Sequence, residues 1–97
     1  RIEAWELLLR VRALENQFYA GGINGSGETP VDRYCGGSVA ADPVGSVLVR
    51  GGAGEEQLDF SVDPAAVART RRRMPVERDR REDVYLRLRR EWQRGGR

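Results

Sequence analysis

Hydrophobic residues recur every three or four positions over residues 3–17, a spacing that places them on one side of an α-helix. We call this side the leucine face, and it comprises Ala4, Leu7, Leu8, Val11, Leu14 and Phe18, with Trp5 beside it. Glu6 and Arg10 lie four residues apart on the opposite side, in the order that favours an ion pair. The pattern predicts an amphipathic helix that packs through its leucine face, and the expected partner is a sheet.

The next part of the chain alternates between short apolar runs and residues that favour turns. Residues 18–23 are apolar and predict a buried strand, and the glycine-rich residues 24–30 that follow predict a flexible loop. Residues 37–50 predict a hairpin, because the Asp-Pro-Val-Gly sequence at 42–45 has the type I turn preference at each position. In residues 57–62 apolar and polar residues alternate strictly, which predicts a fourth strand with one buried face.

Two further helices are predicted in the C-terminal part of the chain. Asp63 is a good N-cap and Pro64 suits the first helical position, so a helix should begin there and end near Arg73, before Pro75. Residues 84–93 predict a tail helix. One side of this tail helix carries Tyr85, Leu88 and Trp92.

These elements predict an α/β fold of four strands with two main helices in one layer, and an uncovered second face of the sheet. The chain begins at Arg1, without an initiator methionine and inside the first helical pattern. We therefore expect these residues to belong to a longer protein that covers the open face. No apolar run approaches the ~20 residues that a membrane-spanning helix needs.

Charge is distributed unevenly along the chain. All 17 basic residues are arginine, so an amine or imidazole base is absent from the sequence. Residues 1–68 hold 5 arginines and 10 acids, a net charge of −5, whereas residues 69–97 hold 12 and 5, a net charge of +7. An arginine-rich segment of this kind suits nucleic-acid binding or assembly without catalysis. Because acids are interleaved with the arginines, a solvated helix that pairs with acids elsewhere is the favoured interpretation.

The only thiol of the chain is Cys35, which excludes an internal disulfide and favours a reducing, cytoplasmic setting. A nucleophilic cysteine needs a base, a cation or a helix N-terminus to lower its pKa. The sequence has no histidine, and Cys35 stands at the entry of a predicted strand. We therefore interpret Cys35 as structural or incidental.

Seven short motifs follow one another in a fixed order between about residues 3 and 86. They are Arg-Ala-x-Glu-Asn-Gln at 12–17, Asn24 with Gly27, Tyr34 with Gly36 or Gly37 and Ser38, Asp-Pro-x-Gly at 42–45, Phe-Ser-Val-Asp at 60–63, Arg71 with Pro75, and the run 79–85. Each motif is common by itself, and their order carries the signal. Together they resemble the C-terminal third of the carbon–nitrogen hydrolase (nitrilase) superfamily, nearest to its bacterial omega-amidase-like members.

The resemblance implies that residues 1–97 form the C-terminal part of an α-β-β-α sandwich, with residues 76–97 as a C-terminal tail. It also implies hydrolysis of a non-peptide C–N bond by a Glu base, a Lys that stabilises the tetrahedral intermediate and a Cys nucleophile that forms a thioester. In the family all three precede the helix matched by residues 3–17, so none is assigned to this chain. No metal and no cofactor are expected.

Three residues are candidates for supporting roles. Asn24 follows a predicted strand, where pocket walls are common, and the resemblance places its loop near the mouth of the active site. It either contacts substrate or only forms a turn before Gly25. Arg12 and Glu15 either form an ordinary helix ion pair or brace the segment that bears the nucleophile. The expected partners are a small-molecule amide and further copies of the chain in a homo-oligomer, without nucleic acid or membrane.

Overall fold

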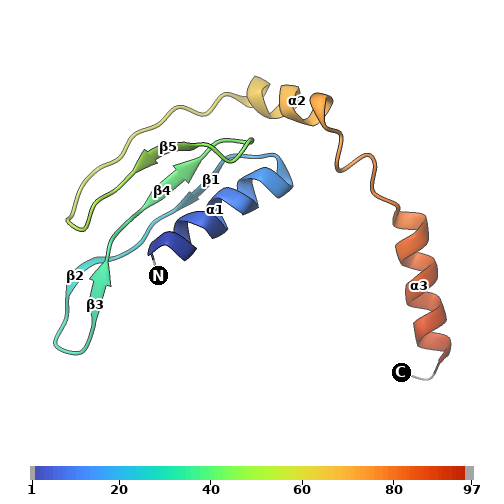
Figure 1. Cartoon of the computed structure of the whole chain (residues 1–97), viewed down its shortest axis with the longest axis horizontal. Helices are drawn as coiled ribbons and strands as arrows, with labels where there is room; N and C mark the ends of the chain where they lie inside the picture. Colours follow the sequence, from blue (N-terminus) through green and yellow to red (C-terminus); the bar gives the residue numbers. More distant parts are fainter. Residues whose placement is uncertain (1, 96–97) are drawn as a thin grey trace.

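The computed structural model describes residues 2–95 and arranges them in a flat layer with an arm. Its elements in chain order are α1 (Ile2–Asn16), β1 (Ala20–Gly22), β2 (Ser26–Glu28), β3 (Arg33–Cys35), β4 (Val39–Ala41), β5 (Val47–Arg50), α2 (Pro64–Arg73) and α3 (Glu82–Arg94). The strands form two antiparallel sheets, one in the order β1-β4-β5 and one that pairs β2 with β3. Figure 1 shows α1 on one face of the three-stranded sheet, α2 beyond one end of it, and α3 apart from both.

The hairpin of β4 and β5 confirms the prediction from the 42–45 turn. The backbone N–H of Gly45 donates to the carbonyl of Asp42 at 2.9 Å, and the side chain of Asp42 accepts from the backbone N–H groups of Val44 and Ser46. Gly45 has a φ of +80°, a conformation that costs glycine little. On the other edge β4 pairs with β1, which lies within the predicted strand at 18–23.

Helix α1 forms as predicted but packs on the sheet through a different side. The buried residue of α1 is Ala13, and Trp5 and Leu9 lie against β1. A Cβ atom at Gly22 would stand only 2.7 Å from the Trp5 ring, so glycine at this position allows the helix to approach. The leucine face is exposed instead, with Leu7 at 60% of its accessible surface. The prediction that the leucine face meets the sheet is therefore wrong.

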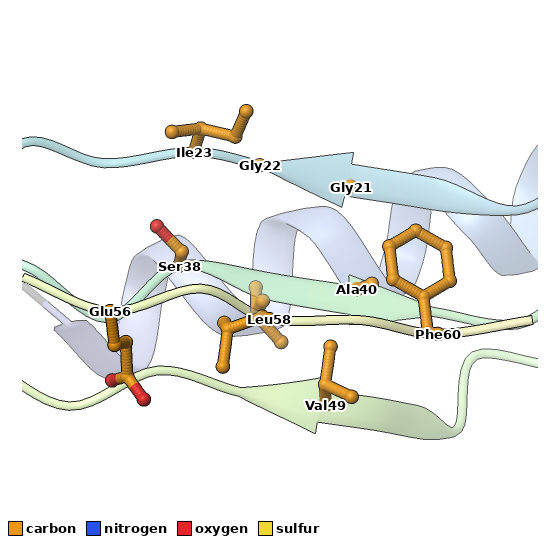
Figure 2. Close-up of a pocket in the computed structure, with 10 residues that line it drawn as sticks. Gly21, Gly22, Ile23, Ser38, Ala40, Val49, Glu56, Leu58 and Phe60 are labelled. Atoms are coloured by element: carbon orange, nitrogen blue, oxygen red, sulfur yellow. The ribbon is translucent and has the colours of Figure 1, made fainter.

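Residues 57–62 do not form the predicted fourth strand of the sheet. They are extended but pair with no strand, and they pass in front of β4 and β5 (Figure 2). Leu58 and Phe60 border the open face of the sheet together with Ala40 and Val49. The alternation therefore marks a segment with one apolar side that lies over a sheet face, outside the hydrogen-bonded ladder.

The predicted flexible loop at 24–30 contains one arm of a hairpin that the sequence did not reveal. Strands β2 and β3 are exposed on both sides, so neither shows the alternation by which a half-buried strand is recognised. Between them the backbone N–H of Thr29 donates to the carbonyl of Asp32 at 2.7 Å, and the hydroxyl of Thr29 accepts from the N–H of Asp32 at 2.9 Å.

Helix α2 begins and ends where its sequence signals predict. The side chain of Asp63 accepts a hydrogen bond from the N–H of Ala65 at 3.0 Å, and Pro64 occupies the first turn. The helix ends at Arg73, before Pro75. Its place beyond the end of the sheet corrects the prediction of two helices in one layer, because only α1 covers the sheet.

Helix α3 also confirms its prediction, and it forms an arm that extends from the rest of the chain (Figure 1). The radius of gyration is 18.7 Å, well above the ~12–13 Å expected of a compact chain of this length. Among residues 2–95 no helix has the length and apolar content needed to span a membrane.

Candidate functional site

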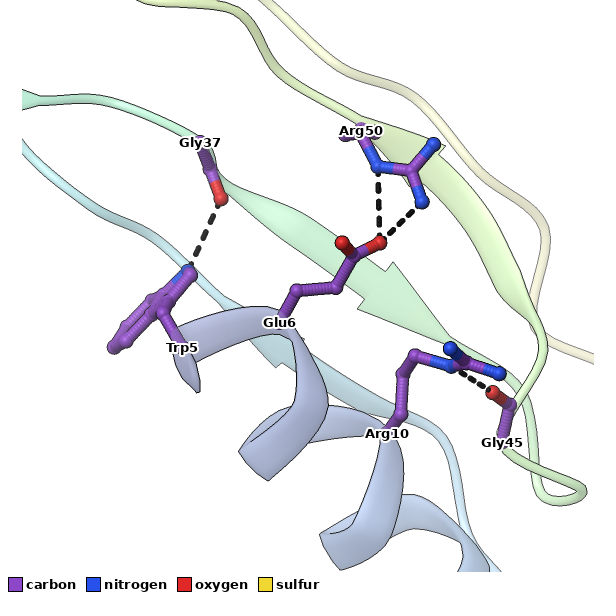
Figure 3. Close-up of polar contacts among 6 residues, drawn as sticks. All are labelled: Trp5, Glu6, Arg10, Gly37, Gly45 and Arg50. Atoms are coloured by element: carbon purple, nitrogen blue, oxygen red, sulfur yellow. Dashed lines mark hydrogen bonds and ion pairs between the residues drawn. The ribbon is translucent and has the colours of Figure 1, made fainter. Parts of the chain in front are cut away.

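Two side chains of α1 hydrogen-bond to backbone carbonyls at opposite ends of β4 (Figure 3). The indole Nε1 of Trp5 donates to the carbonyl of Gly37 at 3.0 Å, just before the strand. The guanidinium Nε of Arg10 donates to the carbonyl of Gly45 at 2.8 Å, in the turn after it. Both carbonyls lie outside the sheet ladder, so the two contacts fix the helix along the strand and satisfy groups that pairing leaves free.

An ion pair between Glu6 and Arg50 adds a third contact between α1 and the sheet, and Arg50 Nε lies 2.9 Å from the carboxylate of Glu6. Arg50 is opposite Val39 in the register of β4 and β5, on the side of the sheet that faces α1. The expected pair of Glu6 with Arg10 is therefore wrong. Both side chains reach across to the sheet, because the helix turns its mixed polar and apolar side toward it.

The C-terminal ends of α1 and α2 cap each other through Gln17 and Arg71. The buried side chain of Gln17 donates from Nε2 to the carbonyl of Met74 at 2.6 Å and to that of Thr70 at 3.4 Å. In return Arg71 donates to the carbonyl of Asn16 at 3.3 Å. The carbonyl of Thr70 also accepts from the N–H of Met74 at 3.0 Å, and that of Met74 from the N–H of Val76 at 2.8 Å. Gln17 and Arg71 therefore add side-chain donors at the last turns of the two helices.

Sequence reasoning missed the role of Gln17, and two signals could have suggested it. Gln17 stands four residues after the buried Ala13, which places it on the packed side of the helix. It is also the last residue of the Arg-Ala-x-Glu-Asn-Gln motif. The neighbouring Asn16 makes no such link, because its side chain donates to the carbonyl of Arg12 within α1 at 2.9 Å.

Asn24 lies at the base of the β2–β3 hairpin, where it joins that hairpin to β4. Its side-chain amide donates to the carbonyl of Gly36 at 2.7 Å, and its backbone N–H donates to the hydroxyl of Ser38 at 2.9 Å. The sulfur of Cys35 is 3.9 Å from the same amide nitrogen. The amide oxygen of Asn24 has no hydrogen-bond partner within residues 2–95, so it is free to accept a bond from a bound molecule.

A cavity of about 270 Å³ opens beside Asn24. Its walls are the start of the β2–β3 hairpin and the glycine-rich turn after β5, where Glu56 accepts a hydrogen bond from the N–H of Gly52 at 2.5 Å. Backbone amides, the two glutamates Glu55 and Glu56, and the amide side chain of Asn24 thus meet at this rim. The cavity offers both donors and acceptors to a small polar molecule.

An apolar groove of about 330 Å³ adjoins this rim on the open face of the sheet. Figure 2 shows the segment of Leu58 and Phe60 in front of the sheet, running between Ala40 on β4 and Val49 on β5. Gly21 leaves further space on β1. The groove and the rim form one continuous surface on the side of the sheet that α1 does not cover.

The remaining sequence candidates lie apart from this surface. Arg12 and Glu15 form the expected pair at 3.8 Å, and both side chains are mainly exposed on α1. A pair of this kind contributes only ~0.2–1 kcal/mol to stability. Cys35 is exposed on β3 as a free thiol. Among residues 2–95 there is no group of three or more acidic, cysteine or histidine side chains placed to bind a metal.

The charged residues just before α3 and in its first turn form a cluster of ion pairs. Arg80 pairs with Glu82 at 2.9 Å and with Glu77 at 3.7 Å, and Arg81 forms two hydrogen bonds of 3.0 Å with Asp83. The bond from Arg81 lowers the pKa of Asp83 below its ordinary value. Because every partner lies within a few residues, the cluster orders the start of α3 without tying it to the sheet.

Comparison with known proteins gives one consistent family. The sequence profile described as Carbon-nitrogen hydrolase matches residues 2–72. The chain is 36% identical to the 2-oxoglutaramate amidase of Bacillus subtilis over 88% of its own length and 33% of that protein. It is 34% identical to the omega-amidase NIT2-A of Xenopus laevis over 84% of its length and 30% of that protein.

A solved structure has the same arrangement of elements. The carbon–nitrogen hydrolase of Helicobacter pylori G27 superposes with a TM-score of 0.79 at 29% sequence identity. The match covers 89% of this chain and 32% of that structure. The chain thus spans about one third of the length of the proteins that it resembles.

Proposed function

This chain belongs to the carbon–nitrogen hydrolase family, and we propose that it forms part of an enzyme that hydrolyses the amide C–N bond of a small molecule. The observation that carries the proposal is the 36% identity to 2-oxoglutaramate amidase over 88% of the chain. Omega-amidases of frog and yeast are similar over the same region. An omega-amidase-like reaction is therefore the specific form of the proposal.

In this proposal residues 1–97 supply the C-terminal part of the catalytic domain, and residues 76–97 its tail. The match to one third of each relative supports this division. The open face of the sheet then becomes an inner face of an α-β-β-α sandwich. Leu58, Phe60 and Val49 provide an apolar surface for a second sheet, while α1 forms the outer layer.

The catalytic Glu, Lys and Cys lie, on this proposal, in the part of the protein that precedes these residues. The Cys thiolate attacks the amide carbon, and the tetrahedral intermediate collapses as the C–N bond breaks and the protonated amine or ammonia leaves. A water molecule then cleaves the thioester to give a carboxylate and restore the thiol. Cys35 takes no part, because it is exposed on β3 without an adjacent base.

Asn24 has the role of a substrate contact at the rim of the site. Its amide nitrogen is held by the carbonyl of Gly36, which leaves the amide oxygen oriented and available as an acceptor. The rim cavity that it borders also contains Glu56 and backbone amides. Arg12 and Glu15 have a supporting role, as an exposed pair on α1 that braces the segment bearing the nucleophile. The enzyme works as a homo-oligomer in the cytoplasm.

The test is release of ammonia from 2-oxoglutaramate by the intact protein that contains this chain. We expect activity in the intact protein and none in the 97 residues alone. Cys35→Ser should keep full activity, whereas Asn24→Ala should raise KM more than it lowers kcat. Val31→Ala, at the exposed tip of the same hairpin, is the matched control and should change neither.

Two results would oppose the proposal. An intact protein that releases no ammonia from any ω-amide of a short dicarboxylic acid would exclude the reaction. Activity of the isolated 97 residues that disappears in Cys35→Ser would place the nucleophile within this chain and overturn the assignment of the chemistry.

A further inference from the structure

Asn24 is followed directly by Gly25, and this pair brings together the two groups of a self-modification reaction. Asparagine is thermolabile because its side-chain amide can be attacked by the next backbone nitrogen. Glycine has no Cβ atom to shield that nitrogen. Within residues 2–95 the N–H of Gly25 forms no hydrogen bond. The attacking nitrogen of the reaction is therefore available in this fold.

The side chain and backbone of Asn24 are held by contacts that oppose the reaction. Its Nδ2 donates to the carbonyl of Gly36 at 2.7 Å, and its backbone N–H donates to the hydroxyl of Ser38 at 2.9 Å. Gly36 also holds the next residue, because its N–H donates to the carbonyl of Gly25 at 2.9 Å. A ring between Cγ of Asn24 and the nitrogen of Gly25 can close only if Asn24 turns, which disrupts these bonds.

Ser38 and Gly36 are themselves fixed by the three-stranded sheet. The carbonyl of Ser38 accepts from the N–H of Gly51 at 2.6 Å, just after β5. Figure 2 shows the hydroxyl of Ser38 directed from β4 toward the end of β1. Gly36 is buried. Asn24 is therefore held by the sheet, and its contacts are lost only when this part of the fold opens.

From these contacts we propose that Asn24 is a deamidation site whose rate is set by its bonds with Ser38 and Gly36. The nitrogen of Gly25 loses its proton to hydroxide and bonds to Cγ of Asn24, and the Cγ–Nδ2 bond breaks as ammonia leaves with a proton from water. A second water molecule then opens the cyclic imide at either of its carbonyls, which gives aspartate or isoaspartate. Folding slows the first step.

Conversion changes the chemistry of the rim cavity. It removes the donor that the carbonyl of Gly36 accepts, and it places a carboxylate at a rim that already contains Glu55 and Glu56. An unpaired carbonyl and a third negative charge both disfavour the present arrangement. The modification itself is independent of the proposed function. Its effect on activity rests on the role proposed for Asn24 as a substrate contact.

The test incubates the intact protein at mildly alkaline pH and follows the peptide of Asn24 by mass spectrometry. Ser38→Ala should speed the conversion about threefold to tenfold, because it removes one hydrogen bond. Ser38→Thr keeps the hydroxyl, and Val31→Ala lies at the hairpin tip, so both should convert at the wild-type rate. Gly25→Ala should convert more slowly, because its Cβ atom shields the nitrogen and meets the Tyr34 ring at an ordinary contact of 3.4 Å.

Two references complete the design. The chain has one other asparagine, Asn16, which is followed by Gln17 and should stay unmodified in the same digests. Protein unfolded in urea lacks the contacts of Asn24 and should convert at least about tenfold faster than folded protein. Circular dichroism checks that each variant folds.

Three results would overturn the proposal. They are equal rates in folded and unfolded protein, conversion of Ser38→Ala at the wild-type rate, and conversion of Gly25→Ala at the wild-type rate. Amidase activity is measured on the same samples. A KM that rises with the converted fraction supports the effect on the rim. A constant KM would remove Asn24 from the substrate site, and the measured deamidation rates would still decide the modification.

Discussion

Replacement of Gln17 tests whether the mutual capping of α1 and α2 holds the second helix in place. Gln17 is only 4% exposed and donates to the carbonyl of Met74 at 2.6 Å and, more weakly, to that of Thr70 at 3.4 Å. Gln17→Ala removes both donors, which costs ~1–2 kcal/mol, and one buried methylene, which costs ~0.8 kcal/mol. We expect a loss of about 2–3 kcal/mol in the free energy of unfolding.

The backbone of Gln17 provides an internal comparison. Its φ of +54° is a left-handed conformation that strains any residue with a Cβ atom. Gln17→Gly loses the same hydrogen bonds but relieves that strain, so it should be about 0.5–1 kcal/mol more stable than Gln17→Ala. Gln17→Glu should be the least stable of the three, because a carboxylate cannot donate and places a negative charge at the C-terminal end of α2.

Two measurements on the intact protein compare these three Gln17 variants. Urea unfolding gives the change in overall stability, and hydrogen exchange of the peptide that covers α2 gives the local change. Asn16→Ala is the matched control, since that side chain is exposed and bonds only within α1, and it should cost less than ~0.5 kcal/mol. The capping account would be refuted by a Gln17→Ala variant as stable as this control. It would also be refuted by a Gln17→Gly variant with a lower free energy of unfolding than Gln17→Ala.

Three further predictions concern the helix contact, the tail and its charge. Gly22→Ala should destabilise the protein by ~1–3 kcal/mol, because its Cβ atom would lie 2.4 Å from a Leu9 methyl; an unchanged urea midpoint would contradict this. Asp83 should titrate below 3.8 by NMR and shift back toward that value in Arg81→Gln. Since folding lowers the pKa of Asp83, the stability that its bond with Arg81 gives to α3 should be complete above the ordinary pKa of the carboxyl group. This stability should be lost as the pH falls through the lowered pKa, and the helical signal in circular dichroism would follow the loss. Duplex DNA should bind the intact protein no more tightly than a non-specific basic protein, with ~10⁻⁴–10⁻⁶ M at physiological salt as the reference, and a nanomolar affinity would revive the nucleic-acid alternative.

The elements that the sequence predicted correctly are those whose signals act locally. Asp63 and Pro64 define the start of α2 through a capping hydrogen bond and a fixed φ, and neither depends on distant residues. The turn at 42–45 forms for the same reason, because its side chain and glycine satisfy the turn by themselves. Local chemistry of this kind is readable from one sequence.

The errors concern partners that lie far away along the chain. The strand predicted at 57–62 lacks a ladder partner, although its alternation correctly marks an apolar side. The hairpin of β2 and β3 has no buried side, so no periodicity reports it. The sequence placed Asn24 only at the end of a predicted strand. Its hydrogen bonds with Gly36 and Ser38 join residues more than ten positions apart, and the folded structure was needed to reveal them.

Helix α1 shows why the strongest pattern indicated the wrong contact. Its most regular apolar side is the leucine face, which this chain leaves exposed, whereas the side that packs on the sheet mixes Ala13 with polar residues such as Gln17. A mixed side suits this contact because the sheet offers free carbonyls at both ends of β4, and Trp5 and Arg10 hydrogen-bond to them. A uniformly apolar side has no such carbonyls to satisfy and suits another apolar stripe. The periodicity therefore reports an apolar side of the helix, and it does not by itself identify the surface that this side meets.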